Sequence, residues 1–363
     1  MRSGLFILIL CIALSSCDTN DSGKGAPITD NSAETLDVEW IPGFGFPHDL
    51  IAAQTGTRYR LESDRVLHST DGGVSWTTTV SVLPDGWLEM IYPAAVTPDG
   101  QIIVGLLDLT IGDGVRARYH GLARSSDGGA TFVEITPDWL GPQNVDVFLS
   151  RVIGDAFGNV FVEAYGDYAL YRSSDVGDTW SKVFDDFECC AVISFSTDGT
   201  VYMLGQRKKV YVSQDLGLNW SSMPDGPFED VLDIDFLNEQ NIYLLGGNFV
   251  GGLIQGIGSV FHTPDRGNSW SRLFLPRLTM SVRSLAIGAN GHIFVSVDDL
   301  DFHYVYRSID GGETWEEISD GLPKNLFDTV DGRVRLMLDD WGYLYASVGP
   351  SVFRTSERLG GIR

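Results

Sequence analysis

The stretch YRSIDGGETW, residues 306–315, decides the fold, because variants of it occur six times in this chain of 363 residues. The shared pattern is Ser/Thr-x-Asp-x-Gly-x-x-aromatic. Its opening Ser or Thr lies at positions 69, 125, 173, 213, 263 and 308. Successive copies are therefore separated by between 40 residues (173 to 213) and 56 residues (69 to 125). Self-similarity at this period is typical of β-propellers and solenoids.

The sequence around the sixth copy breaks into four short β-segments joined by turns. A run that ends at Gly291 is followed by HIFVSV (292–297), YVYRSI (304–309), the turn DGGE (310–313) and TWEEIS (314–319). Helical periodicity is nearly absent, and the same series fits the other copies. Four antiparallel strands per unit, repeated radially, predict an all-β propeller.

The ends of the chain set the number of blades. Thr355 lies 47 residues after Ser308 (355 − 308), on the period of the repeat, but no fourth strand follows it. An open strand edge is an aggregation template, so another segment must pair with it. We expect TLDVEWIPG (35–43) to do so. The sequence therefore predicts a seven-bladed β-propeller of four-stranded antiparallel blades, closed by an N-terminal strand.

The repeated motif has a structural role in the turn between the third and fourth strands. Its Asp accepts backbone N–H bonds, its second Gly takes a positive φ, and its aromatic ring folds over the turn. A single carboxylate per motif does not provide the ligand set of a calcium loop. The structural residues are Asp71, Asp127, Asp175, Asp215, Asp265 and Asp310, with Trp76, Trp180, Trp220, Trp270 and Trp315.

The motif resembles the Asp-box, or BNR repeat, of sialidases, sortilin-like receptors, xyloglucan-degrading enzymes and photosystem II assembly factors. The resemblance covers about residues 36–363 and implies a propeller, but it says little about the ligand, because propellers host unrelated functions. Sialidase-like chemistry is disfavoured. The resemblance would require an Arg before Ile-Pro, and EWIP (39–42) has Trp40 there.

The N-terminus reads as an export signal. Arg2 precedes an apolar run, Leu5–Leu14, that is too short to span a bilayer and ends in LSSC. This ending resembles a bacterial lipobox, which implies a signal peptide at 1–16, lipidation of Cys17, a tether at 17–35 and the propeller at 36–363. We therefore expect a lipid-anchored envelope protein, periplasmic or surface-exposed. The alternative is ordinary signal cleavage, with Cys17 left as a spare thiol.

Charge and composition exclude several classes of partner. The formal net charge of −24, without a basic run longer than Arg207–Lys209, argues against nucleic acid. The adjacent Cys189 and Cys190 predict either a vicinal disulfide or two small buried residues. The histidines show no metal-binding spacing, so we expect no metal or cofactor. We also expect the protein to be a monomer.

Ligand-binding residues are expected on the face opposite the motifs. The second-to-third turns and the links between blades lie there and vary in length. Trp87 and Trp139 fall on these links, where they would stack on a sugar or clamp a peptide. The alternative is that they cap the core between blades.

Counting back from the first turn of each blade gives positions of equal depth near the mouth of the central channel. They are Asp49, Pro93, Arg151, Val192, Asp233, Ser284 and Arg335, with Arg283 and Arg333 close by. The arginines and aspartates among them predict a site for a carboxylate or an acidic sugar. The alternative is a ring of structural ion pairs.

The sequence therefore favours a non-catalytic binding or assembly module for an envelope protein or a glycan. The main rival is a glycoside hydrolase or lyase that uses two carboxylates on the same face. Its candidate carboxylates are Glu188, Asp225, Glu229, Asp230, Asp298 and Asp331. A third possibility is a purely structural envelope protein.

Overall fold

The computed structural model divides the chain into two units, Met1–Leu36 and Asp37–Arg363, and the described residues all belong to the second. They are residues 40–43, 50–52, 57–62, 64–71, 75–86, 89–112, 115–140, 147–185, 192–196, 198–204, 209–228, 230–247, 259–276, 281–298, 302–323, 334–339, 341–348 and 351–361. Within these ranges there is no helix, and hence none long and apolar enough to cross a membrane.

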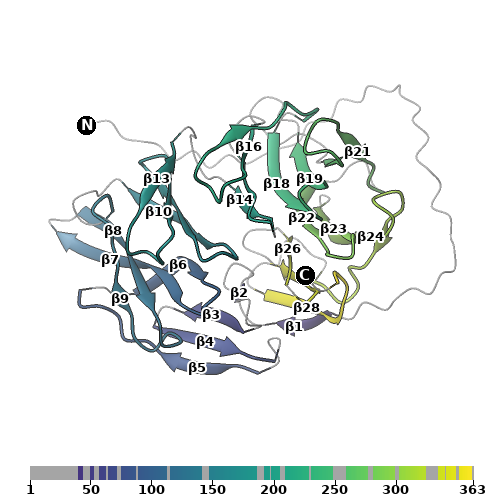
Figure 1. Cartoon of the computed structure of the whole chain (residues 1–363). Helices are drawn as coiled ribbons and strands as arrows, with labels where there is room; N and C mark the ends of the chain where they lie inside the picture. Colours follow the sequence, from purple (N-terminus) through teal and green to yellow (C-terminus); the bar gives the residue numbers. More distant parts are fainter. Residues whose placement is uncertain are drawn as a thin grey trace. The chain divides into compact units, whose positions relative to one another are not determined.

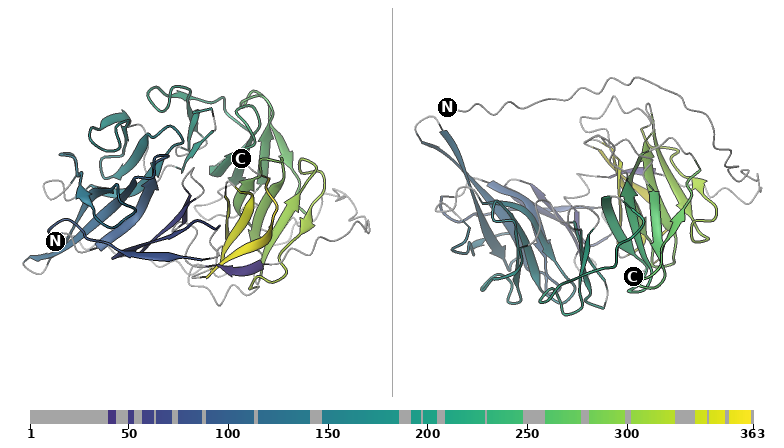
Figure 2. Two further views of the ribbon diagram at one scale, coloured as in Figure 1. Left: turned by 60° about the horizontal axis from the view of Figure 1, so that its bottom comes forward. Right: turned by 90° about the horizontal axis from the view of Figure 1, so that it is seen from above.

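The strands form seven four-stranded sheets, one for each blade (Figures 1 and 2). Blade 1 contains β2 (Leu50–Ala52), β3 (Arg58–Glu62), β4 (Arg65–Ser69) and β5 (Thr77–Val80). Blade 2 contains β6 (Glu89–Val96), β7 (Ile102–Gly112), β8 (Val115–Ser125) and β9 (Val133–Glu134). Blade 3 contains β10 (Phe148–Gly154), β11 (Val160–Tyr165), β12 (Ala169–Ser173) and β13 (Ser181–Phe184). Blade 4 contains β14 (Val192–Phe195), β15 (Val201–Leu204), β16 (Val210–Ser213) and β17 (Ser221–Ser222).

The remaining three blades follow the same order. Blade 5 contains β18 (Asp230–Phe236), β19 (Ile242–Gly247), β20 (Ser259–Thr263) and β21 (Ser271–Leu273). Blade 6 contains β22 (Ser281–Ile287), β23 (Ile293–Asp298), β24 (His303–Ser308) and β25 (Glu316–Glu317). Blade 7 contains β26 (Val334–Leu338), β27 (Tyr343–Val348), β28 (Ser351–Arg358) and the N-terminal β1 (Trp40–Gly43). The prediction of a seven-bladed propeller with four-stranded antiparallel blades is confirmed.

Blade 7 is built from both ends of the chain. Strand β1 pairs antiparallel with β28, from Trp40 opposite Thr355 to Gly43 opposite Val352. A buried ion pair joins the same blade to blade 1, between Arg58 and Asp339. The Arg58 guanidinium also lies 4.6 Å from the centroid of the Trp341 ring, in cation–π contact. Hydrogen bonds and a buried charge pair therefore both hold blade 7 in the ring.

The hydrophobic core is divided into clusters between neighbouring blades. All six residues of β23 are buried, because both faces of this middle strand are covered. Phe294 packs with Val334 of blade 7, while Val295 packs with Tyr243 of blade 5. Alternate residues of β23 thus pack against the blades on either side of it. Burial of apolar side chains between neighbouring blades stabilises the ring.

The motif turns, which join the third and fourth strands of blades 1 to 6, have the expected geometry. The Asp310 carboxylate accepts a hydrogen bond from the Thr314 N–H at 2.9 Å, and the Ser308 hydroxyl accepts one from the Gly312 N–H at 2.8 Å. Gly312 has a φ of 94°. In blade 3 the indole N–H of Trp180 donates to the Gly177 carbonyl at 3.1 Å. The motif therefore stabilises the turn between the third and fourth strands by hydrogen bonds within the turn itself. We call the end of the propeller at which these turns lie the motif face.

Candidate functional site

The predicted channel residues occupy equivalent places on the innermost strands. In blades 3, 5 and 6 a β-bulge directly precedes them, at Leu149/Arg151, Val231/Asp233 and Val282/Ser284. Arg335 pairs with Ser347 on the second strand of blade 7. The bulge re-aims the side chain that follows it, so Arg151, Asp233 and Ser284 occupy equivalent positions along their inner strands.

The other predicted positions are less informative. Val192 is paired with Leu204, and Pro93 falls within the irregular pairing between Ile91 and Ala94 of blade 2. Asp49 and Arg333 lie outside the described residues, as do Trp87, Cys17, Cys189 and Cys190. The predictions for these six residues remain predictions.

Asp233 joins two blades. Its carboxylate accepts hydrogen bonds from the N–H of Ile234 at 3.0 Å and from the N–H of Leu285, on the inner strand of blade 6, at 3.3 Å. Burial raises the pKa of Asp233 to about 7, although these N–H groups and the charge of Arg151 act to lower it. The positive charge of Arg151 on blade 3 thus acts on the carboxylate of Asp233 on blade 5.

The same connection recurs at two neighbouring positions. Asp235 accepts a hydrogen bond from the Ile287 N–H at 2.7 Å, and the Ser284 hydroxyl accepts one from the Leu336 N–H at 3.1 Å. Each polar side chain therefore satisfies an N–H group on the inner strand of the next blade. This part of the channel wall is therefore held partly by side chains that reach across to the next blade.

Arginines provide the positive charge of this region. Arg151 is 39% exposed and lies 3.9 Å from the buried Glu163 carboxylate. Arg335 is exposed, and within the described part of the chain it forms no ion pair. Both guanidinium groups are therefore able to contact an anionic ligand.

A buried carboxylate holds the third arginine. Arg283 donates from Nε to Asp298 at 2.6 Å, and Asp298 is 4% exposed. The other Asp298 oxygen lies 2.7 Å from Nδ1 of His303, which is also buried. The sequence analysis did not select His303. His303 begins β24 directly opposite Asp298, the last residue of β23. The sequence does not show this register, so it offers no pattern by which His303 could have been selected.

Trp139 lies in the core between blades 2 and 3. Its ring stacks on Tyr171 at a centroid distance of 3.7 Å and meets Trp180, a motif residue, edge-on at 6.2 Å. Leu140 beside it is fully buried in the same cluster. This placement agrees with the alternative role of Trp139, capping the core between blades.

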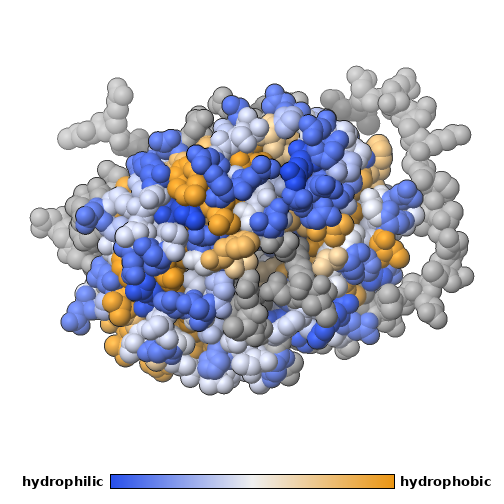
Figure 3. Space-filling model, in the orientation of Figure 1, coloured by the Kyte–Doolittle hydropathy of each residue, from blue (hydrophilic) through white to orange (hydrophobic). Residues whose placement is uncertain are grey.

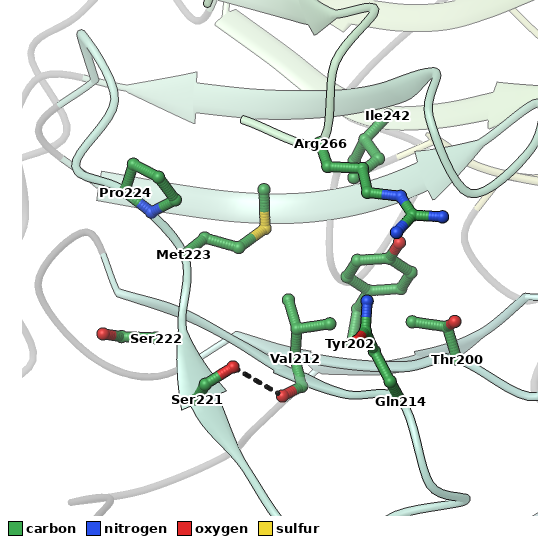
Figure 4. A pocket seen from close by; sticks show the side chains of 10 residues that line it. All are labelled: Thr200, Tyr202, Val212, Gln214, Ser221, Ser222, Met223, Pro224, Ile242 and Arg266. Atoms are coloured by element: carbon green, nitrogen blue, oxygen red, sulfur yellow. Dashed lines mark hydrogen bonds between the residues drawn. The ribbon is translucent and has the colours of Figure 1, made fainter. Parts of the chain in front are cut away.

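A pocket of about 190 Å³ opens between blades 4 and 5 at the motif face (Figure 4). Its apolar part comes from Tyr202, Val212, Met223, Pro224 and Ile242. Its polar part comes from Thr200, Gln214, Ser221, Ser222 and Arg266. Figure 4 shows Arg266 extending toward the Tyr202 side chain, with Met223 and Pro224 on the other side. The sequence analysis did not predict a site on this face.

Two further surveys of the described residues bear on function. No group of three or more His, Cys, Asp or Glu residues among them is arranged to hold a metal ion. The surface seen in Figure 3 is mainly hydrophilic, with apolar side chains in separate islands. That view therefore shows no single broad apolar face.

The chain is similar to two kinds of known propeller. It is 24% identical to a xyloglucanase of Paenibacillus sp. over 272 residues, which cover 71% of this chain and 25% of the enzyme. It is 25% identical to the photosystem II assembly lipoprotein Ycf48 of Synechococcus sp. (strain CC9902) over 181 residues, or 47% of this chain and 50% of Ycf48. The aligned part thus spans between a quarter and a half of these curated relatives.

The solved structures show the fold. Ycf48 bound to a D1 peptide superposes with a TM-score of 0.62 over 90% of this chain and 96% of that one, at 14% sequence identity. No protein-family model matches the chain. The GH74 xyloglucanase from Xanthomonas campestris superposes with a TM-score of 0.61 over 87% of this chain and 53% of that one, at 18% sequence identity. The similar proteins thus include an assembly factor and a xyloglucanase.

Proposed function

We propose that this chain is a non-catalytic binding or assembly module that takes an acidic segment of a partner protein at the channel mouth, opposite the motif face. The observation that carries the proposal is the set of partly exposed arginines there, Arg151, Arg283 and Arg335. Arginine binds carboxylates in a fork geometry that is both strong and orienting. The Asp298 contact engages Nε of Arg283 and so fixes the direction of its guanidinium group.

The similarity to Ycf48 supports a protein partner. The Synechococcus relative is named as an assembly lipoprotein, and the similar solved structure of a Ycf48 contains a bound D1 peptide. The apolar N-terminal run and LSSC fit the same picture of a lipid-anchored protein in the bacterial envelope. A lipid anchor would hold the propeller near membrane proteins under assembly.

A glycoside hydrolase is the second candidate, because the other curated relative is a xyloglucanase. Such an enzyme needs two carboxylates at a fixed separation across a sugar. Of the candidate carboxylates, Asp298 is engaged by Arg283 and His303, and Asp225 is exposed on a link. Glu188, Glu229 and Asp331 lie outside the described residues, and only the backbone of Asp230 is described.

The test compares acidic peptides with their amide counterparts. Asp- and Glu-rich peptides should bind the purified chain, and peptides with Asn and Gln at the same positions should bind at least about tenfold more weakly, since charge-assisted bonds contribute about 1.5–3 kcal/mol. An Arg283→Ala/Arg335→Ala variant should lose the difference. Release of reducing ends from xyloglucan by the wild-type chain would instead establish the hydrolase.

A further inference from the structure

One position in the repeat explains the pocket between blades 4 and 5. It lies on the third strand and directly precedes the opening Ser or Thr of each of the six motifs. In blade 7, which has no complete motif, it directly precedes Thr355. Six blades place a long cationic or imidazole side chain there: His68, Arg124, Arg172, His262, Arg307 and Arg354. Blade 4 has Val212 instead.

The cross-strand partner of this position is equally regular. The second strand provides Tyr59, Ile103, Phe161, Tyr243, Phe294 and Tyr345 opposite the six long side chains. Tyr202 is paired with Val212. Six of the seven blades therefore carry an aromatic ring in this place, and blade 4 combines such a ring with a short apolar neighbour.

Several of these long side chains contact neighbouring residues, and that of Arg124 crosses the groove between two blades near the motif face. His262 stacks on Tyr243 at 4.4 Å with an interplanar angle of 20°. Arg124 extends into the next blade, where it donates to the Val176 carbonyl at 3.0 Å and meets the Asp178 carboxylate at 2.9 Å. A planar cation in this place thus satisfies acceptors of the following motif turn.

The short side chain of Val212 leaves this space open. The pocket is lined by Val212 and Tyr202 from blade 4 and by Ile242 and Arg266 from blade 5. The backbone of Arg266 corresponds to that of Val176. Both follow the motif Asp and have positive φ, 56° and 58°. The carbonyl that accepts from Arg124 in blade 3 therefore has a counterpart beside the pocket.

Charges around the pocket favour a cation. Arg266, the charged residue of the lining, is ion-paired with Glu239. The carboxylates of Asp198 and Glu239 and the guanidinium group of Arg266 all act electrostatically on Tyr202, so among the described residues that do so two are negative and one is positive.

We propose that this pocket binds the side chain of an arginine presented by a partner polypeptide. The aliphatic part of that side chain would contact Val212 and Met223, and its guanidinium group would take the place that Arg124 takes between blades 2 and 3. The proposal is independent of the channel mouth, which lies at the opposite face.

The test uses the full chain and the peptide acetyl-Gly-Arg-Gly-amide, with binding observed by saturation-transfer NMR. The control peptide contains citrulline, which has nearly the same shape without the charge. We expect millimolar binding of the arginine peptide, as befits one side chain, and at least about fivefold weaker binding of the citrulline peptide. Equal binding of both peptides would overturn the proposal.

A matched pair of variants tests the location. Val212→Arg supplies in blade 4 the side chain that other blades carry, so it should abolish peptide binding. Val80→Arg adds the same charge at an exposed position of β5 and should leave binding unchanged. Should Val212→Arg fail to fold, Ser222→Trp, on the exposed rim, blocks the same pocket. Wild-type binding in a folded Val212→Arg or Ser222→Trp protein would refute the site.

Discussion

Arg58 of blade 1 and Asp339 of blade 7 form an ion pair in which each side chain is only 2% exposed. Removing one partner leaves an uncompensated charge in the interior, which typically costs about 3–5 kcal/mol. We therefore expect Arg58→Met to lower the free energy of unfolding by about that amount in a denaturant titration. Arg65→Met, at the exposed pair with Asp64, should change it by about 1 kcal/mol or less. Equal effects of the two variants would contradict the interpretation.

The raised pKa of Asp233 predicts a pH-dependent stability. Below its unfolded pKa near 3.8 the group is protonated in both states, and above the folded pKa of about 7 it is charged in both. Between these values the folded protein holds a proton that the unfolded chain has lost, so stability falls as pH rises. Asp233→Asn keeps an acceptor for the Leu285 N–H but removes the charge.

Thermal unfolding of wild type and Asp233→Asn at a series of pH values checks this prediction. The stability of the variant relative to wild type should increase from about pH 4 to pH 7 and then stay constant. Parallel curves over that range would show that burial does not raise this pKa.

The lowered pKa values of two motif aspartates predict that the stability of the protein decreases as the pH falls below about 4. Hydrogen bonds from Thr131 hold the pKa of Asp127 at about 2, and those from Asn219 do the same for Asp215. Their stabilising contribution is complete above the unfolded value near 3.8 and is lost as pH falls toward 2. The midpoint of thermal unfolding should therefore drop between pH 4 and 2. The drop should be smaller in Asp127→Asn/Asp215→Asn.

The position of Trp139 predicts that its main contribution is to stability. Trp139→Ala removes a ring stacked on Tyr171 and should lower the free energy of unfolding by about 3–5 kcal/mol. Trp139→Phe keeps a ring and should lose less. Acidic-peptide binding should be unchanged wherever the Trp139→Phe protein remains folded. A loss of peptide binding at unchanged stability would make Trp139 a ligand residue instead.

The blade plan was predictable because one hairpin motif recurs on a fixed period. Turn chemistry at Ser308, Asp310 and Gly312 is local, so the residues themselves specify it. Counting from a turn respects the register of an antiparallel pair, and Arg151, Asp233, Ser284 and Arg335 accordingly pair at equivalent positions on their second strands. Packing across blades was not predictable. The stacking of Trp139 on Tyr171 joins the link between blades 2 and 3 to the third strand of blade 3, and no local pattern states which faces meet.

The pocket between blades 4 and 5 was not predictable from the sequence for a different reason. The motifs define the repeat, whereas the residue that precedes each motif differs between blades. The substitution of Val212 for Arg or His is visible in the sequence. Its consequence depends on packing between blades, because the pocket beside Val212 is lined by residues of both blade 4 and blade 5.

The pairing of Trp40 with Thr355 makes the ring dependent on its two most distant strands. Contacts of such sequence separation form late, because a loop of several hundred residues must close first. A chain still being synthesised cannot complete blade 7 before residue 355 has emerged. Until then the edge of β1 has no β28 to pair with and is available to other strands, so nascent chains are exposed to mispairing.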